Sequence, residues 1–449
     1  MKYLILFAVI VMMNGACRHK GDYQPVFDNP GLYSKSVYEL NSVVMDNNFS
    51  PVVAARNYVY ANIAAYECIA AGDYRFVSLV GQIKHMPVMP KPAEPAKVNY
   101  HLAALLSLIK VGNAVTFPEG ALMDYWQNLY DKADSAGMPA DVLKQTVAFS
   151  DTIVSAILKW SKGDNYAQTR SAEKYTVTVE DGRWVPTPPA YAQAMEPHWC
   201  EIRPMSLDSA SQFAPPAPPV FNVKSPTSHF YKDVMEVKTV GDSLTDEQRH
   251  IADFFDDNPF NLHVTGHAMY ATKKFSPPGH WMNIVGIATQ KAGKDFSTTV
   301  AAYAATSIAL FDGFIACWYT KYKTNGVRPE TVINKYFDPN WRPYIQTPPF
   351  PTYVSGHSVI SNASAEVMTY FLGDHFAFTD TSESEFGIAN RSFRSFRDAA
   401  QEASFSRLYG GIHYRSDLEQ GNEVGKKVGA YVVSKLHFQR NQNQLSQNK

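Results

Sequence analysis

The sequence predicts an all-α protein, a helical bundle interrupted by one long proline-rich irregular segment. Three observations predict this fold. Apolar residues recur at helical spacing over most of the chain, prolines gather between residues 163 and 245, and 45 % of the 449 residues are hydrophobic, which is enough for a large core. The charges nearly cancel, with 41 Lys and Arg against 42 Asp and Glu, so we expect no nucleic-acid partner.

Residues 1–16 resemble a secretory signal peptide. Lys2 precedes an apolar stretch, Tyr3 to Met13, that is too short to span a bilayer, and Asn14-Gly15-Ala16 resembles a cleavage site. Cys17 follows as in a bacterial lipoprotein signal, although Asn14 stands where that signal prefers a leucine-like residue. We expect an exported bacterial protein, periplasmic or held at the outer membrane or cell surface by a lipid on Cys17. A buried N-terminal helix with an incidental cysteine is the alternative.

Helical patterns dominate the first part of the mature chain. Residues 50–71 begin with a Ser-Pro start signal and continue with apolar and alanine positions at helical spacing, and similar patterns recur near 98–112, 118–133 and 139–161. Prolines, which helix interiors exclude, then accumulate from 163 to about 245. This stretch is rich in aromatic residues, so we predict an ordered segment that covers the helices; a flexible linker is the alternative.

Helical periodicity resumes at Asp246 and continues to about Leu436. Val300 to Tyr319 is strongly apolar, but Asp312 lies inside it and lysines close it, which favours a buried central helix over a membrane span. Asp312 then needs a hydrogen-bond partner in the core.

We predict a single domain over residues 17–449, with N-terminal helices and the covering segment at about 30–245 and a core bundle at about 246–437. Asp256 and Asp257 are predicted to be solvated caps, since the spaced pattern of a calcium loop is missing. The remaining cysteines form no Cys-x-x-Cys pair, and their spacing leaves disulfide pairing open; they are Cys68, Cys200 and Cys317.

Cationic and hydrogen-bonding groups are concentrated between residues 318 and 417. Lys321 and Arg328 follow the apolar helix. Ser355-Gly356-His357 then stands where a helical pattern begins, and free N–H groups at a helix start bind oxyanions. Taken singly, a lysine at a helix end and a capping turn also have ordinary structural explanations.

The third segment runs from Ser406-Arg407 to His413 and Asp417. Asp417 is four residues past His413, within reach to orient its ring and fix its tautomer. A satisfied structural histidine is the alternative for His413 alone.

Together, these segments resemble the signature of the vanadium-dependent haloperoxidase and type 2 phosphatidic acid phosphatase superfamily: Lys-x6-Arg-Pro, Ser-Gly-His and Ser-Arg-x5-His-x3-Asp, in that order. One departure is Val354, where many members have proline. Trp318 and Phe350 match aromatic positions of chloroperoxidase-type members, and in length and motif placement the chain resembles bacterial iodide peroxidases. The absence of a credible spanning helix in the mature sequence disfavours the membrane phosphatases.

The resemblance implies a vanadate cofactor, in a site that phosphate can also occupy. Its oxygens would be bound by Lys321, Arg328, Ser355, Gly356 and Arg407. Lys321 would in addition be catalytic, because its point charge can polarise bound peroxide.

The resemblance also implies roles for the two histidines and for the aromatic residues. His413, oriented by Asp417, would be the vanadium ligand, and His357 would act as the general base toward hydrogen peroxide. Trp318 and Phe350 would form an apolar wall facing the halide, although large aromatics are commonly plain core residues.

The function implied is oxidation of a halide, iodide first and bromide second, by hydrogen peroxide, with a small organic molecule as acceptor. A homodimer is common in the family. The alternative is an acid phosphatase of the same superfamily, in which His413 forms a phosphohistidine and His357 protonates the leaving alcohol. A third reading is a binding protein that retains the oxyanion pocket without turnover.

Overall fold

The structure is a computed structural model that describes residues 22–440 except 260 and 266. Its helices are α1 (Gln24–Phe27), α2 (Pro30–Asp46), α3 (Pro51–Gly72), α4 (Tyr100–Val115), α5 (Met123–Ser135), α6 (Ala140–Ser161), α7 (Tyr166–Thr169), α8 (His229–Asp242), α9 (Asp246–Phe254), α10 (Pro277–Lys291), α11 (Phe296–Thr324), α12 (Pro329–Tyr336), α13 (Gly356–Leu372), α14 (Phe396–Tyr409) and α15 (Arg415–Lys435). The 3₁₀ turns are Pro95–Lys97, Trp199–Glu201 and Ser384–Phe386. The predicted all-α class is confirmed. The predicted signal peptide and Cys17 lie outside the described residues.

Sheet structure is confined to two short antiparallel pairs in the described part of the chain. Strand β1 (Asn261–Thr265) pairs with β2 (Ala268–Thr272), and β3 (Phe378–Asp380) pairs with β4 (Arg391–Phe393). Both pairs interrupt the stretch that helical periodicity predicts as helix. Strands this short leave no distinct period of their own in the sequence.

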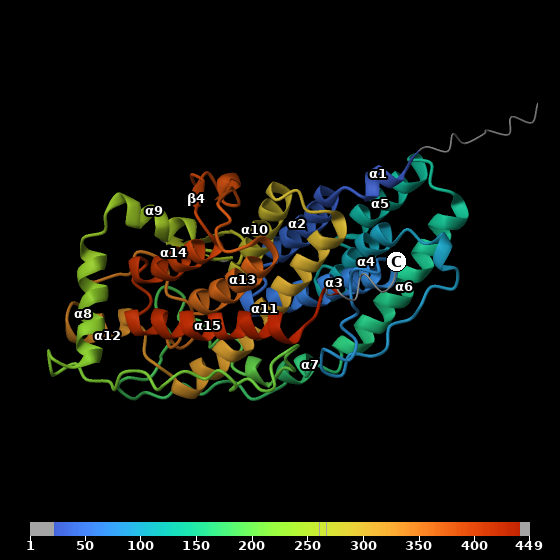
Figure 1. Ribbon diagram of the computed structural model, residues 1–449. Helices are drawn as coiled ribbons and strands as arrows, with labels where there is room; N and C mark the ends of the chain where they lie inside the picture. The colour runs from blue at the N-terminus through green and yellow to red at the C-terminus, as the bar shows by residue number, and fades with distance from the viewer. Residues whose placement is uncertain (1–21, 260, 266, 441–449) are drawn as a thin grey trace, which may run out of the picture.

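Helix α11 is the element that joins the two ends of the elongated molecule (Figure 1). It packs against α3 of the N-terminal helices and against α13 and α15 of the C-terminal ones. By length and composition it could cross a membrane, but its most apolar 18-residue window is fully buried inside the fold. Asp312 accepts hydrogen bonds from the backbone N–H groups of Met205 and Ser206, both at 2.7 Å. The predicted buried central helix, with a satisfied Asp312, is confirmed.

Helices α13 and α15 approach each other closely along a stripe of glycines on α15. A Cβ atom on Gly425 would lie 2.2 Å from the Val359 carbonyl oxygen, and one on Gly429 would lie 2.4 Å from that of Ala363. No larger side chain fits at such distances, so glycine spacing of four residues sets the contact. This contact fixes the start of α13 beside the start of α15.

The proline-rich segment is ordered and covers the bundle, as predicted, running along one long edge of the molecule towards α8 (Figure 1). Trp184 and Trp199 are fully buried. Main-chain hydrogen bonds of 3.0 Å from Trp184 N to Asn325 O and of 2.9 Å from Met195 N to Pro349 O attach it to the loops around α12. The division into N-terminal and core parts remains a prediction.

Three expectations differ from the structure or are settled by it. Helix α8 occupies the end of the stretch expected to be irregular, because the prolines stop before it begins. Asp256 and Asp257 are buried, with exposed fractions of 6 % and 4 %, so their prediction as solvated caps was wrong. The cysteines of the described chain are free thiols, namely Cys68, Cys200 and Cys317.

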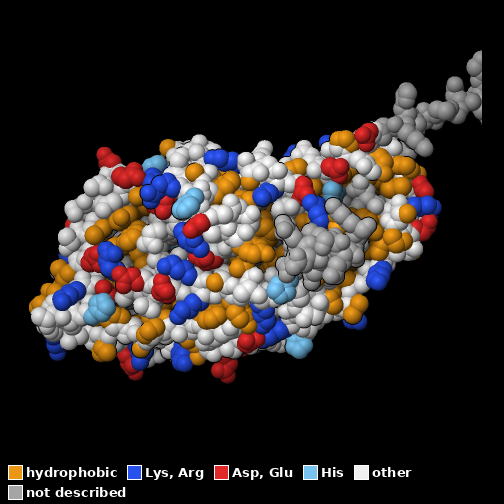
Figure 2. Space-filling view, in the orientation of Figure 1, with side chains coloured by type: hydrophobic (Ala, Val, Ile, Leu, Met, Phe, Trp, Pro, Cys, Tyr) orange, Lys and Arg blue, Asp and Glu red, His pale blue; other side chains and the backbone are white. Residues whose placement is uncertain are grey.

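The surface agrees with the near-zero net charge. Figure 2 shows basic, acidic and apolar side chains interspersed over the face in view, with no broad field of one sign.

Candidate active site

A cavity of about 460 Å³ lies where α11, α13 and α14 meet the loops before α13 and α15. It brings together residues that the sequence analysis singled out from three separate segments. Trp318, Phe350, His357, Arg407 and His413 all line it. Gly356 lines it as well, and Lys321, Arg328 and Asp417 contact Phe350 and His413 from behind.

The first turn of α13 forms one wall. Ser355 is its N-cap, and its Oγ accepts a hydrogen bond of 3.3 Å from Ser358 N. The backbone N–H of Ser355 donates to Asp417 O at 3.1 Å, which ties this helix start to α15. Gly356, the first helical residue, lines the cavity, where its lack of a side chain leaves the helix N-terminus open to an anion.

Lys321 is completely buried near the end of α11. Its Nζ donates to the carbonyl oxygens of Pro351 and Thr352, both at 2.9 Å. An ammonium group has three N–H donors, so one remains for a further acceptor. Burial lowers the pKa of Lys321 to about 7, which an anion in the cavity would reverse.

Arg328, at the start of α12, is also fully buried. Its Nε donates to Phe350 O at 2.8 Å and its Nη1 to Ile412 O at 2.9 Å, while Nη2 has no hydrogen-bond partner among the described residues. Burial lowers the pKa of this guanidinium to about 9. A buried donor without a partner is costly, so Nη2 indicates a missing acceptor.

Arg407 on α14 is a second buried guanidinium with a nitrogen that has no hydrogen-bond partner. Its Nη1 donates to Phe255 O at 2.5 Å, and its buried Nε has no partner within the described chain. Burial lowers its pKa to about 10, although the carboxylates of Asp256 and Asp257 act in the opposite direction. Arg407 lines the cavity, and the buried Lys321 and Arg328 lie just behind its Phe350 and His413 wall, so an anion bound there would be stabilised by three cations.

The contacts of His413 decide its tautomer. Nδ1 lies 2.9 Å from Asp417 Oδ2 and 3.2 Å from Thr352 Oγ1, while Nε2 lies 3.1 Å from Arg328 Nη1. Arginine can only donate, so Nε2 must be the unprotonated nitrogen, and Nδ1 carries the proton toward the carboxylate. Burial, followed by the nearby arginine and lysine charges, holds the pKa of His413 well below its usual range. His413 thus keeps a lone pair on Nε2.

His357 has a looser carboxylate partner. Its Nε2 lies 3.5 Å from Asp257 Oδ2, close enough for a charge contact, but it makes no hydrogen bond among the described residues. Burial and the charge of Arg407 lower the pKa of His357 to about 4, so the ring is neutral at pH 7. With Nε2 toward Asp257, Nδ1 is the nitrogen left for a group in the cavity.

Aromatic rings close the site. The rings of Trp318 and Phe350 are 5.0 Å apart, and the Phe350 ring lies 4.9 Å from both Lys321 Nζ and Arg328 Cζ. Trp318 Nε1 donates to Met195 O at 3.2 Å, which attaches the covering segment to this wall. The rings stabilise two cations and present an apolar face to the cavity.

Comparison with known proteins identifies the family. A crystal structure described as that of the first bacterial vanadium-dependent iodoperoxidase is 41 % identical in sequence, covers 92 % of this chain and 98 % of its own, and superposes with a TM-score of 0.86. This chain belongs to the vanadium-dependent haloperoxidase family. A sequence model of the second helical-bundle domain of vanadium chloroperoxidases (VCPO) matches residues 301–442. No curated protein matches the chain.

More distant structures share the haloperoxidase fold. The holo form of a bacterial vanadium-dependent chloroperoxidase is 15 % identical, covers 93 % of this chain and 96 % of its own, and has a TM-score of 0.65. The apo form has the same identity and TM-score, covering 87 % and 94 %. At this identity the likeness shows the fold alone.

The cofactor of this haloperoxidase is vanadate, and the cavity fits it. The donors without partners, Arg328 Nη2 and Arg407 Nε, are charged groups of the kind that bind oxyanion oxygens. The open Gly356 N-terminus and the third N–H of Lys321 add further donors. His413 Nε2, which accepts from Arg328 Nη1 here, is an unprotonated nitrogen of the kind that would bind the metal atom.

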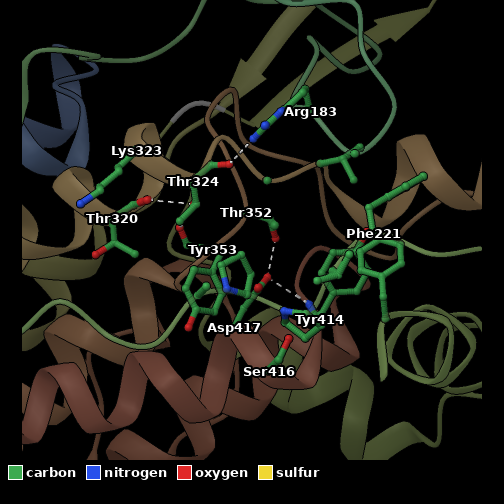
Figure 3. Close-up of a pocket in the computed structure, with 18 of the residues that line it drawn as sticks. Arg183, Phe221, Thr320, Lys323, Thr324, Thr352, Tyr353, Tyr414, Ser416 and Asp417 are labelled. Carbon is green, nitrogen blue, oxygen red and sulfur yellow. Dashed lines mark hydrogen bonds between the residues drawn. The ribbon is translucent and has the colours of Figure 1, made fainter. Parts of the chain in front are cut away.

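A second cavity, of about 630 Å³, lies behind the site and is drawn in Figure 3. The proline-rich segment from Pro215 to Phe221 lines it together with Thr352 and Asp417. Thr352 donates a hydrogen bond to Asp417 Oδ2, and Tyr414 N donates to the same oxygen at 3.2 Å. His413 thus faces the active-site cavity while its carboxylate partner faces this rear one.

Sequence reasoning missed two residues of this site. Thr352 lies inside the motif stretch before Ser-Gly-His, and its hydroxyl contacts both His413 and Asp417. Asp257 lies on the loop after α9, far from every motif in the sequence. A polar residue inside the motif could have suggested Thr352, whereas nothing local marks Asp257.

Proposed function

We propose that this haloperoxidase oxidises iodide with hydrogen peroxide and passes the oxidised halogen to a small organic acceptor. The observation that carries the proposal is 41 % identity, over nearly the whole length of both chains, to a protein described as a bacterial vanadium-dependent iodoperoxidase. The aromatic wall of Trp318 and Phe350 supports it, because iodide is a large and weakly hydrated anion. Iodide is also the easiest of the three halides to oxidise.

Vanadate, when bound, supplies a Lewis acid that activates hydrogen peroxide toward halide without changing its own oxidation state. The protein supplies binding, orientation and proton transfer. Arg328 and Arg407 hold oxyanion oxygens with their guanidinium groups, and Ser355 and Gly356 offer donors from the helix start. His413 Nε2 provides the single protein ligand, because Asp417 fixes the proton on the other nitrogen.

Two residues act on the peroxide. His357 is neutral and its Nδ1 is free of Asp257, so this nitrogen takes the proton of incoming hydrogen peroxide as a general base. Lys321 would offer its remaining N–H donor from behind Phe350, where its positive charge would stabilise oxygen that becomes more negative.

The test is reconstitution of the purified protein with orthovanadate, followed by assays of iodide, bromide and chloride oxidation by peroxide. We expect vanadate-dependent oxidation of iodide, less of bromide and none of chloride. Equal turnover of bromide would contradict iodide preference. Phosphatase turnover without vanadate, together with no halide oxidation, would instead establish a phosphatase acting through a phosphohistidine on His413.

We further propose export with lipid attachment at Cys17, supported by the apolar stretch and the small residues before it. Mass spectrometry of the protein expressed with its own N-terminus in a bacterium tests this. A diacylated N-terminal cysteine is expected, and an intact residue 1 would contradict export. A homodimer, common in this family, is tested by light scattering of the reconstituted enzyme.

A further inference from the structure

A buried cluster of ionisable side chains lies next to His357: Asp257 lines the active-site cavity, and His280 and Asp380 lie behind it. Asp257 comes from the loop after α9, His280 from α10 and Asp380 from β3. Their exposed fractions are 4 %, 1 % and 0 %. Such groups are buried only when each is paired, so their mutual contacts are informative.

Both ring nitrogens of His280 contact carboxylates. Nδ1 lies 2.8 Å from Asp257 Oδ1, and Nε2 lies 2.9 Å from Asp380 Oδ2. A neutral imidazole has one N–H, whereas two carboxylate acceptors need two. Asp380 is held as an acceptor, since Ser382 N and Ser382 Oγ donate to its other oxygen at 2.9 and 2.6 Å. With both carboxylates ionised, each nitrogen of His280 carries a proton and the ring is positively charged.

The ring of His280 is fixed in place by aromatic neighbours. Phe255 stacks on it at 5.4 Å with an interplanar angle of 21°, and Phe254 meets it edge-on at 5.4 Å. These two residues lie just before Asp257 in the chain, so the same loop supplies both the packing and the carboxylate. Because the His280 ring is held rigidly, the Asp257 carboxylate that it contacts is also held in one orientation.

Other charged groups face the cluster. Glu383 Oε1 lies 3.8 Å from His280 Nδ1, and burial raises the pKa of Glu383 to about 8, so it is neutral at pH 7. Lys274 Nζ lies 4.0 Å from Asp256 Oδ2, and Arg407 binds the carbonyl groups of Phe255 and Asp256. None of these contacts is a hydrogen bond to the Asp257 carboxylate, whereas His280 makes one at 2.8 Å.

We propose that His280 is a positioning residue, a buried imidazolium that anchors Asp257 so that Asp257 holds His357 with Nε2 inward and Nδ1 toward the cavity. The inference rests on the proposed function, because it assigns the basic nitrogen of the residue that accepts the peroxide proton. Asp257 uses its two oxygens on the two rings, Oδ1 on His280 and Oδ2 on His357. Loss of the charge on His280 would free Asp257 to take a proton and release His357.

The first test reads protonation directly and needs no turnover. Protein labelled with ¹⁵N in histidine is examined by NMR without vanadate at pH 7, and His280→Gln assigns the signals of residue 280. We expect protons on both nitrogens of His280 and on Nε2 alone of His357. A single protonated nitrogen on His280 would overturn the proposal. If His280→Gln does not fold, Asp380→Asn replaces it and should remove the Nε2–H signal of His280.

The second test separates positioning from structure. For His280→Gln we expect kcat with iodide to fall about 10- to 100-fold while vanadate affinity is retained. The acid limb of the pH profile should move to higher pH, since Asp257 and His357 both lose a neighbouring cation and take up protons more easily. His101→Gln, which removes a histidine paired with Asp28 outside the site, should change neither property. An unchanged pH profile, or equal loss of vanadate affinity, would overturn the proposal.

A metal ion is the competing explanation, because Asp257, His280 and Glu383 offer ligand atoms within 4.8 Å of one another. Elemental analysis of the protein as purified decides between the two. Less than a tenth of a divalent ion per chain is expected, and one ion per chain that disappears in His280→Gln would overturn the proposal. Inactive parent enzyme with a doubly protonated His280 would refute the proposed function and leave the imidazolium standing.

Discussion

The active site contains two histidine–carboxylate pairs that are built in opposite ways. His413 and Asp417 are four residues apart at the start of α15, and their atoms meet at 2.9 Å. His357 and Asp257 come from segments far apart in the chain and meet at 3.5 Å. The local pair is tight because one helix turn sets its geometry, and Thr352 and Tyr414 N donate to the same carboxylate oxygen, Oδ2. The distant pair depends on packing.

The difference matches the role proposed for each histidine. A metal ligand has to keep one nitrogen unprotonated throughout, which a short contact ensures. A general base has to gain and lose a proton, which a looser contact permits. We infer that the tight pair governs cofactor binding and the loose pair governs turnover.

The largest effect is expected from His413→Ala. Without its only protein ligand, vanadate should not be retained after dialysis, and halide oxidation should fall to the level of free vanadate. Equilibrium dialysis and the ⁵¹V NMR spectrum measure this. His229→Ala, an exposed histidine on α8 that is paired with Asp233, is the control and should bind normally. Normal vanadate retention in His413→Ala would remove the ligand assignment.

Asp257→Asn should impair turnover and leave cofactor binding intact. The amide keeps the size of the carboxylate but loses its charge, so His357 is no longer held in one tautomer. We expect kcat to fall about 100-fold, within the range for general base catalysis, with vanadate affinity changed less than threefold. Steady-state kinetics at saturating vanadate measures this.

Asp417→Asn should show the reverse pattern. The carboxylate that fixes the proton on His413 Nδ1 is lost, and we expect vanadate affinity to fall about 10- to 100-fold. At saturating vanadate, kcat should recover most of its value, as a titration with vanadate will show. Equal loss of affinity in the Asp257 and Asp417 variants would break the distinction between the two pairs.

The pH dependence of the parent enzyme should report the protonation of His357 in the His357–Asp257 pair. His357 must be unprotonated to accept a proton, and its pKa is lowered to about 4. Activity with hydrogen peroxide should therefore rise tenfold per pH unit below pH 4 and level off above it. Measurement of kcat/KM for peroxide between pH 3 and 7 tests this, and an acid limb near pH 6.5 would mean that His357 is not desolvated.

The smallest effect concerns Glu67 on α3, a buried carboxyl group without a cation. Burial raises its pKa to about 7, whereas Asp257, beside His280, has its pKa lowered. A raised pKa means that the contribution of Glu67 to stability is full below pH 4.5 and is lost as pH rises through 7. Urea unfolding of Glu67→Gln and the parent should show the variant gaining relative stability from pH 5 to pH 8, by at most about 3 kcal/mol. No change in this difference would contradict it.

Much of the site could be predicted from sequence because its motifs are compact. Ser355, Gly356 and His357 are consecutive, and His413 and Asp417 are one helix turn apart, so local geometry already places them. The helical class followed from periodicity. The apolar composition of α11 indicated that Lys321 lies near its C-terminal end. The hairpin of β1 and β2 and helix α8 were missed, since short elements leave little periodic signal.

Asp257 and His280 show what could not be predicted. Asp257 looked like a solvated cap because it follows a polar helix, and His280 was part of a Pro-Pro-Gly-His-Trp stretch with no partner in sight. Only the packing of α9, α10 and β3 brings the two within 2.8 Å and buries them behind His357.

The sequence by itself predicted the family, the helical class and the candidate groups for binding the oxyanion, because these depend on residue types at fixed local spacing. The tertiary structure decided which nitrogen of each histidine carries a proton, which donors lack an acceptor and which carboxylates are buried. The physical reason is that protonation and desolvation depend on all neighbours within a few ångströms, and most of those neighbours are distant in the chain.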